Sequence, residues 1–218
     1  MKGTTHLAIG VVIGIVAAVS HQMEAKDVAI YVAVAAFSAL SADLDGTNLL
    51  SGKLNRAARW IHILLLWGGL ALTAVEGYGY VVKGILHLEW AIVAVVALLL
   101  GLVLRNGMIR NALVSLIGIG LIYVGFTDGV LGWLIGLGVF IAWVPWLNHR
   151  GLSHTIWAAA AWGAIGWGLQ QRLGLDGIAQ AALWGYLSHL IADTLTPSGV
   201  KWLYPLAKKS FKLPLGKL

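Results

Sequence analysis

The sequence predicts an all-α, polytopic integral membrane protein. Hydrophobic residues make up 59% of its 218 residues and charged residues only 11%, whereas a soluble domain contains roughly 45–50% and about 25%. The mean hydropathy is +0.84. The 28 glycines and 11 tryptophans are typical of membrane helices and of their interfaces with water. Cysteine is absent, so disulfides, iron–sulfur clusters and thiolate zinc sites are excluded.

Eight apolar segments are the candidates for membrane helices. A bilayer core about 30 Å thick needs about 20 helical residues. The second segment is long enough only if Asp43 and Asp45 belong to its helix. The segments cover roughly 5–21, 28–45, 60–76, 88–104, 111–126, 129–147, 155–170 and 177–193.

The first segment has a second interpretation, as a cleavable signal peptide. Lys2 precedes the apolar run, and Ala18-Val19-Ser20 is a small-x-small triplet of the kind that is cleaved. However, the positively charged region that a signal peptide needs is represented only by Lys2, and cleavage would remove His6. We therefore interpret the segment as the first membrane helix.

The distribution of basic residues predicts that both termini face the cytoplasm. If eight spans alternate from a cytoplasmic N-terminus, only Lys26, Lys83 and Arg172 of the 15 Lys and Arg residues lie outside. Such a bias follows the positive-inside rule. The remaining basic residues, on the inner side, are Lys2, Lys53, Arg56, Arg59, Arg105, Arg110, Arg150, Lys201, Lys208, Lys209, Lys212 and Lys217.

Four polar clusters lie at the predicted cytoplasmic ends of these segments. They are Thr5-His6, Asp43-Leu44-Asp45, residues 148–155 between the sixth and seventh segments, and residues 187–194 at the end of the eighth. Ionisable residues within membrane segments are energetically expensive and are candidates for functional sites. The predicted topology gathers His6, Asp43, Asp45, His149, His154, His189 and Asp193 onto one face.

Each cluster also has a purely structural explanation. His189 and Asp193 are four residues apart and share a helix face, so they can be a simple hydrogen-bonded pair. The two carboxylates of the second cluster can lie in a solvated loop, and the two histidines of the third can be interfacial. We do not expect the remaining histidines, His21, His62 and His87, to be ligands, because they lie on the outer side or among packed apolar residues.

Taken together, the clusters predict a divalent metal site. Neutral imidazoles and carboxylates suit Zn²⁺ first, with Mn²⁺ or Mg²⁺ as alternatives, and the seven candidate ligands allow one or two ions. No glutamate lies on the predicted inner face, so a general base would be an aspartate, for which Asp45 is our candidate. Arg150, between His149 and His154, is a candidate for clamping a phosphate or stabilising developing negative charge. Ser153 and Ser188 directly precede histidines, which does not make a catalytic dyad.

These motifs resemble the inner-membrane metal-dependent hydrolase family, whose members are described as LexA-binding, inner-membrane-associated hydrolases. Residues 185–200 read Gly-Tyr-Leu-Ser-His-Leu-Ile-Ala-Asp-Thr-Leu-Thr-Pro-Ser-Gly-Val and follow the family pattern closely. Residues 149–155, His-Arg-Gly-Leu-Ser-His-Thr, match a second motif in which the family has Thr-His-Ser. The resemblance implies metal-dependent hydrolysis. The use of His and Asp in a helical setting is also reminiscent of zinc-dependent phospholipase C.

The sequence departs from the family pattern in two places. Gly46 stands where the family often has His, so one expected ligand is missing. Residues 60–147 separate the aspartate motif from the His-Arg-Gly motif, where many members have a short connection. We interpret that stretch as four spans, and an even number returns the chain to the same face.

We therefore predict a multi-pass protein of the inner membrane that acts as a metal-dependent hydrolase at the cytoplasmic face. Residues 1–200 form its single domain, and residues 201–218 form a basic amphipathic tail on the membrane surface. The expected partners are membrane lipids, with an anionic lipid or phosphoester as substrate; no nucleic acid is expected, and a protein partner is unknown. The alternatives are an ion or small-solute transporter and a non-catalytic membrane scaffold. Metal content separates the hydrolase from the scaffold, and vectorial flux separates the transporter from both.

Overall fold

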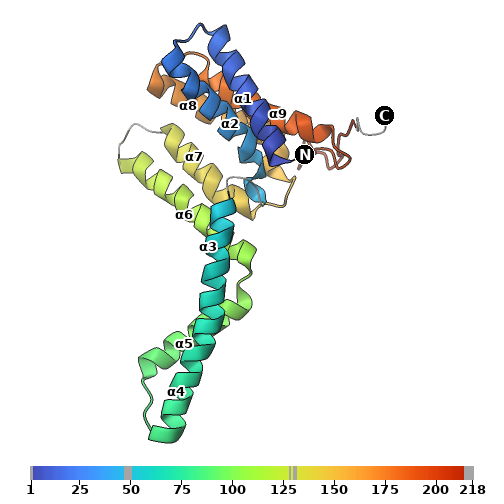
Figure 1. Cartoon of the computed structure of the whole chain (residues 1–218). Coiled ribbons are helices and arrows are strands. Elements are labelled where there is room, and N and C mark those ends of the chain that lie inside the picture. The colour runs from blue at the N-terminus through green and yellow to red at the C-terminus, as the bar shows by residue number, and fades with distance from the viewer. Residues whose placement is uncertain (1, 47–50, 128, 130–131, 214–218) are drawn as a thin grey trace. The chain divides into compact units, whose positions relative to one another are not determined.

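The computed structural model describes residues 2–46, 51–127, 129 and 132–213 (Figure 1). The described residues form helices and no β-strand, which confirms the predicted all-α fold. The chain divides into two compact units, one formed by residues 1–50 and 115–218 and the other by residues 51–114. The sequence-based division treated residues 1–200 as one domain, and the second unit lies inside that range.

Each of the eight predicted segments coincides with a helix or a run of consecutive helices. α2 continues into the short helix η1, so Asp43 and Asp45 are helical, as the length of the second segment required. The elements are α1 (Gly3–Ser20), α2 (Ala25–Ser41), η1 (Ala42–Asp45), α3 (Gly52–Ile63), η2 (Leu64–Gly68), α4 (Gly69–Lys83), α5 (Leu88–Val103), α6 (Asn106–Thr127), α7 (Gly132–Trp143), η3 (Val144–Trp146), η4 (Leu152–His154), α8 (Ile156–Leu173) and α9 (Ile178–Thr194).

Four helical stretches are long and apolar enough to cross a membrane by themselves. They are Gly3–Ser20, Ala25–Asp45, Gly52–Lys83 and Asn106–Thr127, and the helices at Leu88–Val103 and Gly132–Trp146 are apolar but shorter. The protein is therefore a multi-pass membrane protein. The number of eight crossings and the cytoplasmic location of both termini remain predictions.

Close backbone packing joins α1, α2 and α9 in the first unit. A Cβ atom added to Gly14 of α1 would lie 2.4 Å from the Val32 Cα of α2, and one added to Gly185 of α9 would lie 2.5 Å from the Ala35 carbonyl oxygen. Only glycine permits such an approach, which is how membrane helices gain packing without a hydrophobic driving force. This contact fixes the positions of the polar residues at the ends of the three helices.

The second unit is a helical hairpin in which η2 and α4 pack against α5. The contact again depends on glycine, because a Cβ atom on Gly101 would lie 2.6 Å from the Leu66 nitrogen. His62 Nε2 lies 3.0 Å from the Gly101 carbonyl oxygen. This agrees with the interpretation of His62 as a packed residue.

The described part of the C-terminal tail, residues 201–213, is not helical. The chain turns back so that Val200 and Phe211 exchange two backbone hydrogen bonds of 2.9 Å. The Trp202 carbonyl accepts a hydrogen bond from the Ile156 nitrogen at the start of α8, and the Leu213 nitrogen donates to a carbonyl at the end of α9. The tail is thus held beside the polar clusters, while its role at the membrane surface remains a prediction.

Candidate metal centre

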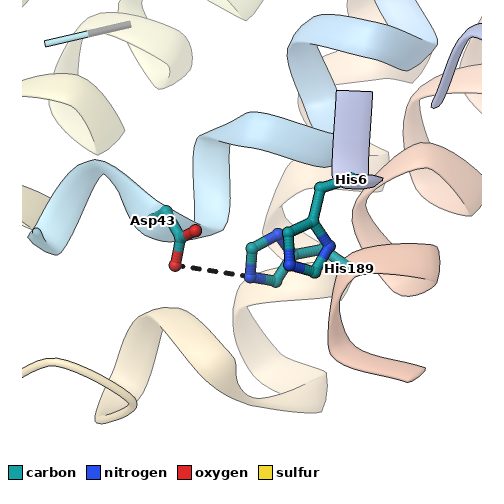
Figure 2. A group of neighbouring side chains, drawn as sticks. All are labelled: His6, Asp43 and His189. Carbon is teal, nitrogen blue, oxygen red and sulfur yellow. Dashed lines mark ion pairs between the residues drawn. The ribbon is translucent and has the colours of Figure 1, made fainter. Parts of the chain in front are cut away.

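Four elements of the first unit bring five predicted ligands together, and we call these residues the inner cluster. His6 lies near the start of α1, Asp43 in η1, His154 in η4, and His189 and Asp193 on one face of α9. The imidazoles of His6 and His189 stack, with ring centroids 3.8 Å apart and planes inclined by 20°. In Figure 2 the Asp43 carboxylate points toward the His189 ring of this stack.

The polar atoms of the inner cluster converge at spacings that suit a bound metal ion. His189 Nε2 lies 3.4 Å from Asp43 Oδ1 and 3.8 Å from Asp193 Oδ2. His154 Nε2 lies 3.6 Å and 3.8 Å from the same two oxygens, and His6 Nε2 lies 3.5 Å from Asp193 Oδ1. Hydrogen bonds are shorter, about 2.7–3.2 Å. Ligand atoms around a tetrahedral ion with bonds of about 2.0–2.2 Å are roughly 3.3–3.6 Å apart.

Hydrogen bonds on the far side of two rings orient their imidazoles toward this point. His189 Nδ1 lies 2.7 Å from the Ala39 carbonyl, which can only accept, so we assign the proton to Nδ1 and a lone pair to Nε2. Ser153 Oγ donates to Asp45 Oδ2 at 2.6 Å and therefore accepts from His154 Nδ1 at 2.9 Å. In the neutral rings, both Nε2 lone pairs then face carboxylates.

A positive charge at the centre of this arrangement would satisfy its unpartnered buried atoms. The Nε2 atoms of His154 and His189 and the Nδ1 atom of His6 are buried and have no hydrogen-bond partner among the described residues, which is rare for buried polar atoms. A proton can supply the charge: burial opposes the charged form of His154, but the attraction of the nearby Asp43 and Asp45 carboxylates outweighs it and raises the pKa of His154 to about 9. A divalent cation supplies it better, because three imidazoles and two carboxylates are a donor set that Zn²⁺ and Mn²⁺ favour.

The remaining two predicted ligands lie beside the inner cluster and form, with Asp43, a second candidate group. One polar atom from each of Asp43, Asp45 and His149 lies within 4.8 Å of the others. His149 Nδ1 lies 2.8 Å from Asp45 Oδ1, and this hydrogen bond raises the pKa of the half-exposed imidazole. A Cβ atom at Gly46 would be 3.6 Å from His149 Nδ1, so the histidine that the resembling family often has there would stand next to this group.

Arg150 contacts the inner cluster through its guanidinium. Its Nη2 lies 2.9 Å from Asp193 Oδ2, while Nη1 donates to the Gly199 carbonyl at 3.0 Å and to Thr196 Oγ1 at 3.3 Å. The backbone nitrogen of Arg150 also donates to Asp45 Oδ2 at 3.2 Å. Arg150 has a φ of +59°, a left-handed conformation that is uncommon for residues other than glycine. Through its contact with Asp193, the Arg150 guanidinium neutralises and orients this candidate ligand.

The structure thus brings all seven predicted ligands and Arg150 into one region of the first unit. The histidines that we did not expect to be ligands have other partners: His21 Nε2 lies 2.9 Å from Gln180 Oε1, and His87 Nδ1 lies 3.4 Å from Glu76 Oε2. Sequence reasoning missed the supporting role of Ser153, which lies inside the His-Arg-Gly motif.

The complete chain, residues 1–218, matches the family model described as the YdjM inner membrane protein. No curated protein and no solved structure matches the chain.

Proposed function

We propose that the chain, which belongs to the YdjM inner membrane protein family, is a metal-dependent hydrolase that acts on a phosphoester or lipid-type substrate at the cytoplasmic membrane surface. The observation that supports this most is the pair of buried imidazole nitrogens, of His154 and His189, that face two carboxylates without a hydrogen-bond partner. Family membership establishes an inner-membrane protein, and the hydrolase activity is our inference from the site.

The residues of the chain would divide the work of hydrolysis as follows. The inner cluster would hold a divalent ion, most simply Zn²⁺, which when bound lowers the pKa of water toward about 7. Arg150 holds Asp193 and places a positive charge at the edge of the cluster, where an anionic phosphoester can approach. The Asp45 carboxylate, our sequence-based candidate for the general base, is buried and bonded to His149 and Ser153. If the second group holds no ion, we therefore assign the base to the exposed His149, which Asp45 orients and which can accept a proton from the attacking water.

Metal analysis of the detergent-purified protein tests the proposal. Zn²⁺ or Mn²⁺ should be present at close to one ion or more per chain, and His189→Ala should lose most of it. His62→Ala is the matched control, because His62 lies in the second unit and contacts the Gly101 carbonyl. A metal-free wild-type protein with full thermal stability would contradict the proposal.

A hydrolysis screen against phosphoesters and phospholipids then tests the reaction. Activity should require the metal and should be lost in His189→Ala but kept in His62→Ala. Metal binding without turnover of any ester would leave a metal-binding scaffold as the better interpretation.

A further inference from the structure

An apolar groove runs between α7 and α8 in the first unit. It consists of two adjoining cavities of about 170 Å³ and 430 Å³, both lined by Phe140, Trp143 and Ala161. The smaller cavity reaches Leu152 and Ser153, and the larger one extends in the opposite direction to Gly132. The two cavities together therefore form one groove that ends at the loop carrying His154.

The groove follows the helix axes for somewhat more than the thickness of one hydrocarbon leaflet. Its lining on α7, η3 and the residue that follows extends from Gly132 to Leu147, which corresponds to about 22 Å at 1.5 Å per residue. One hydrocarbon leaflet is about 15 Å thick. Small residues such as Gly136 form part of its lining. A Cβ atom on Gly136 would lie 3.2 Å from Ile165 Cγ1 on the opposite helix, so a larger residue there would narrow the groove.

The position of the tryptophans orients the groove relative to the membrane. Trp157 lines only the smaller cavity, which reaches Ser153, and Trp143 lines both cavities; they are 50% and 56% exposed, whereas Trp133 at the opposite end of the groove is only partly exposed. Exposed tryptophans concentrate at the level of the lipid headgroups. The end beside the candidate metal centre therefore lies at the interface, and the rest of the groove extends into the hydrocarbon, where the surrounding medium is lipid chains.

The groove and the metal centre share a wall. Ser153 lines the smaller cavity and also hydrogen-bonds to Asp45 and to His154 in the centre. A molecule that places a hydrocarbon chain in the groove would thus hold its polar head close to the ligands.

We propose that the groove between α7 and α8 binds a hydrocarbon chain of an amphiphilic membrane lipid and so selects lipids as the substrate class. The hydrolysis of that lipid's head rests on the proposed function, whereas binding of the chain does not. A single chain matches the groove in chemistry, direction and length. Water-soluble phosphoesters without such a chain would be poorer substrates.

Photolabelling of the full-length protein in liposomes tests the binding directly. A phospholipid with a diazirine in one acyl chain should label residues of the groove, such as Trp143 and Trp157, in preference to other exposed surfaces. Ala161→Phe fills the groove where the two cavities meet. It should lower labelling of these residues about tenfold, the loss expected when roughly two methylenes are excluded.

Ala160→Phe is the matched control, because the neighbouring Ala160 is exposed on the same helix but lines a different cavity. It should leave the labelling unchanged. Equal labelling of Ala161→Phe and wild type would overturn the proposal, as would crosslinks showing that a helix of a second copy occupies the groove. If groove labelling is normal but no lipid is hydrolysed, the binding site stands and the hydrolase proposal fails.

Discussion

Ser153 shows how much of the candidate metal centre depends on a residue that is not itself a candidate ligand. Its hydroxyl, which is buried, donates to Asp45 and accepts from His154 Nδ1, and these two bonds determine which nitrogen of His154 faces the inner cluster. Ser153→Ala should therefore weaken Zn²⁺ binding about 10–100-fold, as expected for outer-shell partners, whereas Ser153→Thr, which keeps the hydroxyl, should bind nearly as well as wild type. Competition with a chelator measures both affinities. Equal Zn²⁺ affinities for Ser153→Ala and wild type would show that the Ser153 hydroxyl does not determine the tautomer of His154.

His154 should also make metal binding depend on pH. Its pKa is raised from 6.5 to about 9, so in the metal-free protein the ring is protonated over this range, whereas a metal ligand must be unprotonated. Each bound ion then displaces one proton, and the apparent Zn²⁺ affinity should rise about tenfold per pH unit between these values. The metal-free protein should instead lose stability as the pH rises through the same range, because deprotonation removes the charge that interacts with Asp43 and Asp45. Chelator competition and thermal unfolding at several pH values check the two opposite trends.

At the scale of the helices, glycine contacts position the site. In α1, Gly14→Ala would force a methyl group to within 2.4 Å of the Val32 Cα, and overpacking of this kind costs about 1–3 kcal/mol. We expect a lower melting temperature in detergent and weaker metal binding, since His6 lies on the displaced helix. Gly120→Ala in α6 is the control, because a Cβ atom there meets nothing within 4 Å and alanine is the better helix former. Similar melting temperatures for the two variants would mean that α1 can shift to accommodate the added methyl group without a loss of stability.

The helices could be predicted from the sequence more readily than their contacts. The thickness of the bilayer sets the length that an apolar run must have to cross it as a helix. Such runs are easy to recognise in a sequence, and all eight predicted segments coincide with helices. The gathering of the ligands was predictable for the same reason, since alternating spans place segment ends on a common face. The Ala39 carbonyl behind His189 was not predictable, because a backbone contact leaves no trace in the identity of either residue. The Asp193 contact of Arg150 likewise depends on a local fold that sequence spacing does not reveal.

For the molecule as a whole, the testable property is its orientation in the membrane. The chain contains no cysteine, so single cysteines can be introduced without a background. Lys209→Cys should react with an impermeant maleimide only after the inner face is opened, and Lys26→Cys should react in intact cells, because the positive-inside rule places these exposed residues on opposite sides. The reverse pattern would place the candidate metal centre on the outer face.

The left-handed backbone of Arg150 has a consequence for how this position can vary. Any residue with a Cβ atom is strained there by roughly 1 kcal/mol, and glycine is not. Arg150→Gly should consequently melt at a higher temperature than Arg150→Ala, although both lose the guanidinium and its contact with Asp193. Selection for stability alone would therefore favour glycine at this position. The arginine is consistent with a loop that gives up part of its stability to place a charge beside the candidate metal centre. If the proposed function is right, a thermostable redesign that replaced Arg150 by glycine would be expected to lose activity while it gained stability.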